Sequence, residues 1–224
     1  MIPRKLEPEA MDSPEEAQAY DAMNHAAVNE RFVADFLAVH GPCRGGEILD
    51  VGTGTARIPI ELCRVDSRAR VLAVDLSESM IALATANVRA AGLGDRIRCR
   101  PADAKSLRLA GPGFEAVVSN SIVHHIPEPT TVLREVSRLA APGGTVFVRD
   151  LARPTSEFEL ARLVELYTGG ESERGRSLFE DSLRAALTVG EVASLIENLG
   201  LPSAGVKMTS DRHWTWIWQR PERG

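Results

Sequence analysis

The sequence predicts an α/β fold built on a doubly wound, mostly parallel sheet. Five short stretches rich in valine or isoleucine alternate with helical stretches, which is typical of parallel strands joined by right-handed crossovers. A glycine turn follows the first of these stretches, and the acid Asp75 ends the second. Sheets of this kind bind ligands outside the carboxyl ends of their strands. We therefore expect one domain with a nucleotide-type ligand at that edge.

The first 45 residues predict a helical segment in front of the sheet. Residues 13–16 (Ser-Pro-Glu-Glu) combine an N-cap, a proline at the first helical position and a capping-box glutamate. The helical pattern continues to His40, with a break near Asn24. We assign residues 1–45 to an N-terminal cap and residues 46–224 to the ligand-binding domain.

The alternating pattern predicts the positions of five strands and of the helices between them. Strands are expected at about 47–51, 70–75, 96–101, 114–119 and 144–149. The clearest helix runs over 78–91, where Ser77 caps it and Gly92 ends it. Another spans about 130–140, before residues 142–144 (Pro-Gly-Gly) turn the chain into the fifth strand.

After Asp150 the alternation is interrupted by a helical insertion over 151–187. Two amphipathic helices are expected there, at 155–168 and at about 176–187. The insertion is either a lid over the ligand or a decoration that shields the sheet. A capping box at Thr188 begins the next helix.

The last segments predict a hairpin. Residues 204–209 form a strand pattern, residues 210–212 a turn, and residues 214–218 a second strand whose three tryptophans alternate onto one face.

The glycine turn itself predicts a bound nucleoside. Gly52 and Gly54 permit positive φ and a close approach of the ligand, and the helix that follows presents unpaired N–H groups. Asp75 offers two acceptor oxygens to a vicinal ribose diol. A dinucleotide fingerprint would have a third glycine where this chain has Arg57. The extra acid Asp50 disfavours a pyrophosphate and suits a ligand with an amino or sulfonium group.

The pattern Asp50-x-Gly52-x-Gly54-x-Ala56, with Asp75 behind it, resembles the nucleotide-binding motif of class I S-adenosylmethionine-dependent methyltransferases. Residues 114–126, 133–135 and 141–145 and the terminal hairpin extend the resemblance over about 46–219. It is closest to the small-molecule methyltransferases of the ubiquinone/menaquinone type. Ala56 departs from it, because the family usually has a third glycine there. The resemblance implies a Rossmann-like, seven-stranded sheet with an antiparallel last strand.

The same resemblance implies the cofactor S-adenosylmethionine, the product S-adenosylhomocysteine, and in-line methyl transfer to a small molecule. Asp50 would face the methionine amino group, Asp75 the ribose and Asp103 the adenine amino group. Leu76 and Met80 would pack on adenine, although a core role for Met80 is an alternative. The full set of expected cofactor residues is Asp50, Gly52, Thr53, Gly54, Asp75, Leu76, Met80, Ala102, Asp103, Ala104, Asn120 and Ser121.

A general base is needed only where the acceptor loses a proton. The candidates for catalysis are His124, His125 and Asp150, which follow the fourth strand or close the fifth. The histidines have an alternative role in ordering their loop. Candidates for acceptor contacts are Tyr20, Tyr167 and His213.

Composition limits the kinds of partner, metal site and cellular compartment that we expect. The net charge is −5 and the basic residues are dispersed, which argues against nucleic acid as a partner. Cys43, Cys63 and Cys99 lack metal or redox spacing, so no metal site and a reducing, cytoplasmic compartment are expected. We find no signal peptide and no membrane span, and we expect a monomer or homodimer.

Two other functions remain open from the residues alone. One is an NAD(P)-dependent oxidoreductase on a Rossmann-like sheet, which Arg57 and the terminal hairpin oppose. The other is a non-catalytic protein that binds an adenosyl ligand. Within methyltransferases, Ser121 and Ile122 stand where an Asn-Pro-Pro-Tyr motif would have prolines, which disfavours amino-methylation of nucleobases or glutamine amides.

Overall fold

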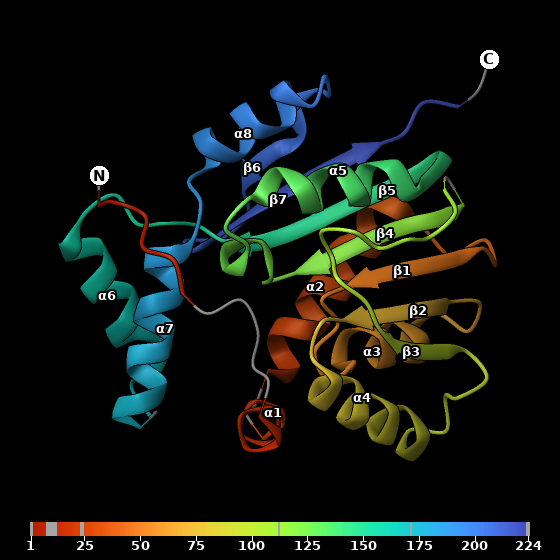
Figure 1. The fold of residues 1–224 in the computed structure, drawn as a ribbon, viewed down its shortest axis with the longest axis horizontal. Coiled ribbons are helices and arrows are strands. Elements are labelled where there is room, and N and C mark those ends of the chain that lie inside the picture. Colours follow the sequence, from red (N-terminus) through yellow and green to blue (C-terminus); the bar gives the residue numbers. More distant parts are fainter. Residues whose placement is uncertain (1, 8–12, 23–24, 112, 171, 223–224) are drawn as a thin grey trace. The chain divides into compact units, whose positions relative to one another are not determined.

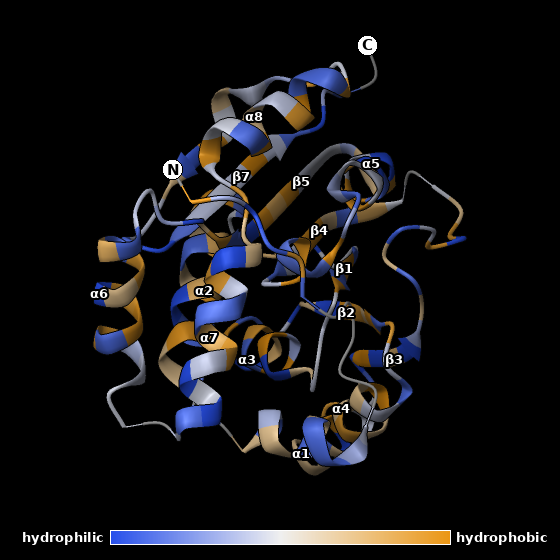
Figure 2. Cartoon of the chain, turned by 60° about the vertical axis from the view of Figure 1, so that its left-hand side comes forward, coloured by the Kyte–Doolittle hydropathy of each residue, from blue (hydrophilic) through white to orange (hydrophobic). Residues whose placement is uncertain are grey.

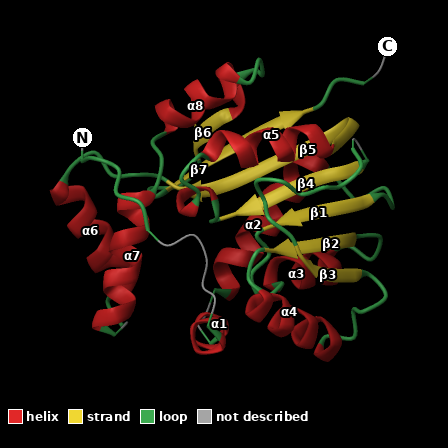
Figure 3. Cartoon of the chain, in the orientation of Figure 1, coloured by secondary structure: helices red, strands yellow, loops and turns green. Residues whose placement is uncertain are grey.

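The computed structural model describes residues 2–7, 13–22, 25–111, 113–170 and 172–222, and its strands form one seven-stranded sheet. The strand order is β3-β2-β1-β4-β5-β7-β6, and β6 pairs antiparallel with β7. The expected sheet with an antiparallel last strand is therefore confirmed (Figure 3). The strands are β1 (Glu47–Val51), β2 (Arg70–Asp75), β3 (Ile97–Pro101), β4 (Phe114–Asn120), β5 (Ala140–Leu151), β6 (Val206–Met208) and β7 (His213–Gln219).

Helices separate the first five strands except β3 and β4, between which the described residues form no helix, so the expected alternation is wrong at that point; α6, α7 and α8 follow β5 (Figure 1). They are α1 (Pro14–Asp21), α2 (Ala26–His40), α3 (Arg57–Val65), α4 (Glu78–Ala90), α5 (Pro129–Leu139), α6 (Glu157–Thr168), α7 (Glu173–Ala185) and α8 (Val189–Asn198), with short 3-10 turns η1 (Val123–His125) and η2 (Ser203–Gly205). The predicted capping boxes at Ser13 and Thr188 are both present. The predicted break near Asn24 lies outside the described residues.

The chain divides into two compact units, which are described separately. The sheet unit comprises Ala10–Asn120, Thr131–Phe147 and Trp218–Gly224. The insertion unit comprises Met1–Glu9, Ser121–Thr130 and Val148–Ile217. The helices α1 and α2 thus fall in the sheet unit, whereas the first nine residues fall in the insertion unit.

In the sheet unit, β1 lies between β2 and β4 and pairs parallel with both. Its residues Ile48, Leu49 and Val51 are fully buried, as expected for a strand covered on both faces. Val51 is in register with Val74, so β1 and β2 end at the same edge of the sheet. The arrows of β1, β2 and β4 point the same way in Figure 3. The turn after β1 therefore lies at the edge of the sheet where these strands end.

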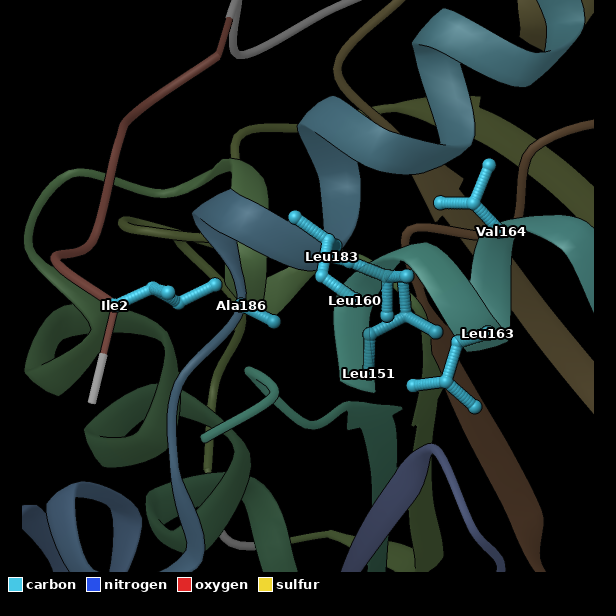
Figure 4. Packing of buried hydrophobic residues seen from close by; sticks show 7 residues of the cluster. All are labelled: Ile2, Leu151, Leu160, Leu163, Val164, Leu183 and Ala186. Carbon is cyan, nitrogen blue, oxygen red and sulfur yellow. The ribbon is translucent and has the colours of Figure 1, made fainter. Parts of the chain in front are cut away.

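In the insertion unit, α6 and α7 pack on each other through an apolar cluster (Figure 4). Both helices carry hydrophobic and hydrophilic residues, as Figure 2 shows. The cluster consists of Ile2, Leu151, Leu160, Leu163, Val164, Leu183 and Ala186. Burial of these side chains joins the first residues of the chain to both inserted helices.

Several element boundaries differ from the sequence-based expectation; for example, β6 covers only Val206–Met208, because Ser203–Gly205 form the turn η2. The strand β5 begins at Ala140 instead of Gly144, because the N–H of Gly143 and the carbonyl of Gly144 both pair with the main chain of Arg220 at 2.9 Å. The helix α7 starts at Glu173, where the Ser172 hydroxyl accepts from the Gly175 N–H and caps it.

Candidate functional site

The turn between β1 and α3 is tied to the end of β2 by its own main chain. The N–H groups of Gly52 and Thr53 both donate to the carbonyl of Val74, at 2.8 and 2.9 Å. Gly52 and Gly54 have φ of 75° and 54°, which glycine adopts without strain. Ala56 also lies in the left-handed region, with φ 61°, where a Cβ is unfavourable. The position that departs from the family pattern therefore keeps a conformation that glycine would adopt more easily.

The Asp75 carboxylate faces this turn. Its Oδ2 accepts from the Gly54 N–H at 2.8 Å, and its Oδ1 accepts from the Ser77 N–H at 3.0 Å. Burial raises the pKa of Asp75, although these N–H groups oppose the shift. A carboxylate has about four acceptor positions, and the N–H of Leu76 also donates to Asp75, so at least one position remains for a ribose hydroxyl.

The two candidate adenine contacts differ in exposure. Leu76 is 42% exposed, which leaves an apolar surface beside Asp75 for a flat ring. Met80 is 6% exposed, and its N–H donates to the capping hydroxyl of Ser77 at 3.2 Å. The core alternative for Met80 therefore has support in its burial.

A cavity of about 300 Å³ opens in front of the glycine turn. Among the residues that line it are Asp50, Thr53 and Asn120, and each has a buried oxygen without a hydrogen-bond partner: Asp50 Oδ2, Thr53 Oγ1 and Asn120 Oδ1. Buried polar atoms in folded proteins are normally satisfied, so the Asp50 and Asn120 oxygens require donors from a ligand or from water, whereas the Thr53 hydroxyl can either donate or accept. Burial raises the pKa of Asp50 to about 7, and the nearby carboxylate of Asp75 adds to this shift.

Helix α1 brings Tyr20 to the same cavity. A Cβ built on Gly54 would lie 3.5 Å from Tyr20 Cε1, so this ring is in contact distance of the turn. Arg57 holds the end of α1 by donating from Nε and Nη2 to the two oxygens of Asp21, at 3.0 and 2.8 Å. Asn87 also donates to Asp21, at 3.0 Å. Arg57, which stands where a dinucleotide fingerprint has its third glycine, therefore anchors the N-terminal helix α1. No motif in the sequence indicates this role.

The residues after the third strand make contacts within the protein. Asp103 accepts from the N–H of Lys105 at 2.9 Å and pairs with its ammonium at 3.0 Å. Burial opposes ionisation of Asp103, but these contacts lower its pKa. Ala102 donates its N–H to the Asp75 carbonyl at 2.8 Å, and Ala104 is half-buried.

In the insertion unit, η1 brings His124 and His125 together with Asp150. Nδ1 of His124 and Oδ1 of Asp150 are 2.5 Å apart, and Asp150 Oδ2 accepts from the N–H groups of Val123 and His124. Ser121 begins this stretch with φ 59° and donates its N–H to the Arg149 carbonyl at 2.9 Å. His124 is 3% exposed, so its ring is held inside the unit.

Glu7 lies beside both histidines, and sequence reasoning did not single it out. Its Oε1 lies 3.3 Å from His124 Nε2 and 3.2 Å from His125 Nδ1. Arg4 supports the same loop by donating to the carbonyls of His124 and Ile126, both at 3.1 Å. No motif marks Glu7 or Arg4, because they lie more than a hundred residues from the loop that they contact.

Of the remaining acceptor candidates, His213 begins β7, and Tyr167 on α6 contacts the turn between β6 and β7. The Tyr167 hydroxyl is 2.9 Å from both oxygens of Asp211, and the Arg212 guanidinium lies 3.4 Å from the centre of its ring. The Arg212 carbonyl accepts from Ala152 just past β5, so this turn lies beside the end of β5. Burial lowers the pKa of His213 to about 4, which leaves it neutral near pH 7.

Comparison with known sequences identifies the domain. A family model described as a methyltransferase domain matches residues 49–148. A ubiquinone biosynthesis O-methyltransferase of Methylococcus capsulatus is 30% identical over 173 residues, which cover 77% of this chain and 70% of the relative. A protein of the same name from Xanthomonas axonopodis pv. citri is 28% identical and covers 70% of this chain, but only 63% of the relative.

Comparison with solved structures shows the same fold. A SAM-dependent methyltransferase from Aquifex aeolicus has a TM-score of 0.64 at 19% identity, covering 92% of this chain and 98% of the other. The plantazolicin methyltransferase BpumL, solved with S-adenosylhomocysteine, has a TM-score of 0.70 at 14% identity, covering 91% and 88%.

Proposed function

Since the chain belongs to the class I S-adenosylmethionine-dependent methyltransferases, we propose that it transfers a methyl group to an oxygen of a small hydroxylated molecule. S-adenosylmethionine is the methyl donor of this family, and S-adenosylhomocysteine is the product. The relatives named ubiquinone biosynthesis O-methyltransferase support oxygen as the accepting atom. The dispersed basic residues and the net charge of −5 support a small acceptor over a nucleic acid.

The observation that carries the proposal is the set of three unpartnered oxygens in the cavity. Asp50 Oδ2 and Asn120 Oδ1 are buried acceptors, the Thr53 hydroxyl can accept or donate, and the α-ammonium group of the methionine moiety offers three N–H donors. A pyrophosphate offers only acceptors and would leave the Asp50 and Asn120 oxygens unsatisfied, which disfavours NAD(P). The donor set of this chain therefore fits the cofactor of the family.

We assign the other cofactor contacts to residues near the same edge of the sheet unit. Asp75 would accept from the ribose with its remaining acceptor capacity, and Leu76 would cover one face of the adenine. Asp103 would accept from the adenine amino group, in competition with its contacts to Lys105. Tyr20 would close the cavity from α1.

The bound cofactor supplies an electrophilic methyl group, and an acceptor hydroxyl must lose its proton as the new bond forms. His125 is our candidate for the base that removes this proton, because its side chain is 22% exposed and that of His124 is only 4% exposed. Asp150 would position His124, which in turn packs on the ring of His125 at a centroid distance of 4.1 Å. Tyr167 and His213 are proposed acceptor contacts.

Two further expectations stay proposals. We propose a monomer or homodimer, and a reducing compartment such as the cytoplasm, which the free thiols of Cys43, Cys63 and Cys99 support. Within the described part of the chain, no helix combines the length and hydrophobicity that a membrane crossing needs.

Calorimetric titration tests the cofactor proposal most directly. We expect S-adenosylhomocysteine to bind the full chain with one-to-one stoichiometry and NAD to give no heat of binding. Asp50→Asn should weaken S-adenosylhomocysteine binding about tenfold or more, because a charge-assisted hydrogen bond is lost. Asp95→Asn is the matched control, since Asp95 is exposed and does not line the cavity.

Methyl transfer is then assayed as S-adenosylhomocysteine formation over a panel of small phenols, catechols and amines. Turnover confined to amines would overturn the assignment to oxygen. Tight binding of NAD with no binding of S-adenosylhomocysteine would overturn the assignment of the cavity.

A further inference from the structure

We propose that Glu7, His124 and His125 form a binding site for one divalent transition-metal ion. One donor atom from each residue lies within 4.8 Å of the other two. Glu7 Oε1 is 3.3 Å from His124 Nε2 and 3.2 Å from His125 Nδ1. Two ligands held about 2.1 Å from one ion are about 3.0 Å apart in octahedral and about 3.4 Å apart in tetrahedral geometry. Both distances from Glu7 Oε1 fall between these values.

Glu7 offers a carboxylate oxygen that could ligate a metal ion. Its side chain is 10% exposed, and Oε1 is buried within ion-pair distance of both imidazoles but accepts no hydrogen bond from any other group. The other oxygen, Oε2, accepts from the Ser182 hydroxyl at 3.2 Å, which fixes the orientation of the carboxylate. A buried carboxylate oxygen aimed at two imidazole nitrogens is unfavourable unless a cation or a proton lies between them.

Asp150 orients His124 for ligation. Its Oδ1 lies 2.5 Å from Nδ1 of His124 and is the acceptor for an Nδ1–H, so the lone pair of the imidazole is then on Nε2, the atom nearest Glu7. Histidines that bind metals commonly donate their second N–H to a carboxylate in this way. Asp150 is itself held by main-chain N–H groups of Val123 and Leu151. A ligand and a supporting carboxylate thus lie on opposite sides of one ring.

The charges around the cluster also suit a cation. The carboxylates of Glu7 and Asp150 lie against the two imidazoles and outnumber the one guanidinium that acts on His124, that of Arg4, which donates to the carbonyls of His124 and Ile126. Two imidazoles and one carboxylate suit Zn²⁺, Co²⁺, Mn²⁺ or Fe²⁺, and leave coordination positions for water or for an oxygen of a small molecule.

The sequence gives no metal pattern because Glu7 is remote from the histidines, so this site revises the expectation that the chain has none. An ion here would take over the role proposed for His125, since ligation through Nδ1 leaves only a protonated Nε2 on that ring. The inference does not rest on methyl transfer, because ion binding is measured without cofactor or acceptor.

Titration of the chelator-treated, untagged full chain with Co²⁺ tests the site. We expect one equivalent to bind, with d–d absorption bands in the visible range, and Zn²⁺ to displace it. Glu7→Gln and His125→Ala should each weaken Co²⁺ binding at least tenfold. Asp150→Asn should weaken it about 10- to 100-fold through the loss of its support for His124.

Glu173→Gln is the matched control, because Glu173 is exposed at the start of α7 and should leave binding unchanged. Circular dichroism shows whether each variant is folded, and Glu7→Gln keeps the test decisive where Asp150→Asn unfolds. Absence of Co²⁺ binding to the wild-type chain, or wild-type affinity in Glu7→Gln, would overturn the proposal. Either result would instead identify the cluster as a proton-linked ion pair between Glu7 and the histidines.

Discussion

The N–H of Gly54 donates to Asp75 Oδ2 at 2.8 Å. This contact makes the acid at the end of β2 a structural support of the glycine turn as well as the proposed ribose acceptor. Because one side chain has both tasks, its replacement should affect stability and cofactor affinity together.

Asp75→Ala and Asp75→Asn separate these two tasks. The alanine variant loses both, so we expect a lower melting temperature and an affinity for S-adenosylhomocysteine reduced roughly 10- to 100-fold. The asparagine variant keeps an oxygen for the Gly54 N–H, so its melting temperature should fall less, while affinity still falls. Equal melting temperatures in all three proteins would contradict the structural task.

Ala56 is a second place where the turn can be tested. Its φ of 61° disfavours a Cβ, so Ala56→Gly should raise the free energy of unfolding by about 0.5–1 kcal/mol in urea denaturation. Ala56→Val should lower it, because a branched side chain is added to a buried left-handed position. A loss of stability in Ala56→Gly would show that the methyl group contributes more by packing than it costs by strain.

Asp50 should make stability depend on pH. Burial raises its pKa from 3.8 to about 7 in the folded chain, so the folded state binds the proton more tightly than the unfolded state. The free energy of unfolding should therefore fall as pH rises from about 4 to about 7, by up to about 1.4 kcal/mol per pH unit for this one group. Asp50→Asn should remove that part of the slope.

The measurement is urea denaturation of the cofactor-free chain at several pH values, with Asp95→Asn as control. The difference in unfolding free energy between Asp50→Asn and wild type should grow with pH up to about 7 and then stay constant. A difference independent of pH would mean that Asp50 is ionised throughout.

His125→Ala addresses the chemical step. With an acceptor identified from the panel, kcat should fall about 10²- to 10⁴-fold, whether the ring removes a proton or holds an ion. Affinity for S-adenosylhomocysteine should stay within about twofold of wild type. Unchanged kcat would exclude both roles for this side chain.

Much of the fold follows from local patterns. Alternation of apolar strands with capped helices predicted the first five strands, and the tryptophan hairpin predicted the antiparallel last strand. The boundary of β5 was wrong, because its first residues are extended by pairing with Arg220, which lies far along the chain. Local patterns contain no information about such a partner.

The glycine turn after β1 and the acid that ends β2 could be placed from the sequence, because strand ends and glycine turns have local signatures, whereas the cofactor roles of their residues stay predictions. These residues are Asp50, Gly52, Gly54 and Asp75. The anchoring of α1 by Arg57 and Asp21, and the approach of Glu7 to two histidines, join segments distant in sequence. Packing of Ile2 with α6 and α7 brings the first residues, and Glu7 with them, into the insertion unit.

The sequence by itself thus determined where most strands and helices occur along the chain. It also determined the glycine turn and the acids that identify the family, because backbone conformation and short-range spacing are local properties. Only the tertiary structure decided which buried oxygens lack partners and which remote carboxylate faces the His124–His125 pair. Both depend on how distant segments pack, and the free energy of that packing is shared among many side chains rather than encoded at one position.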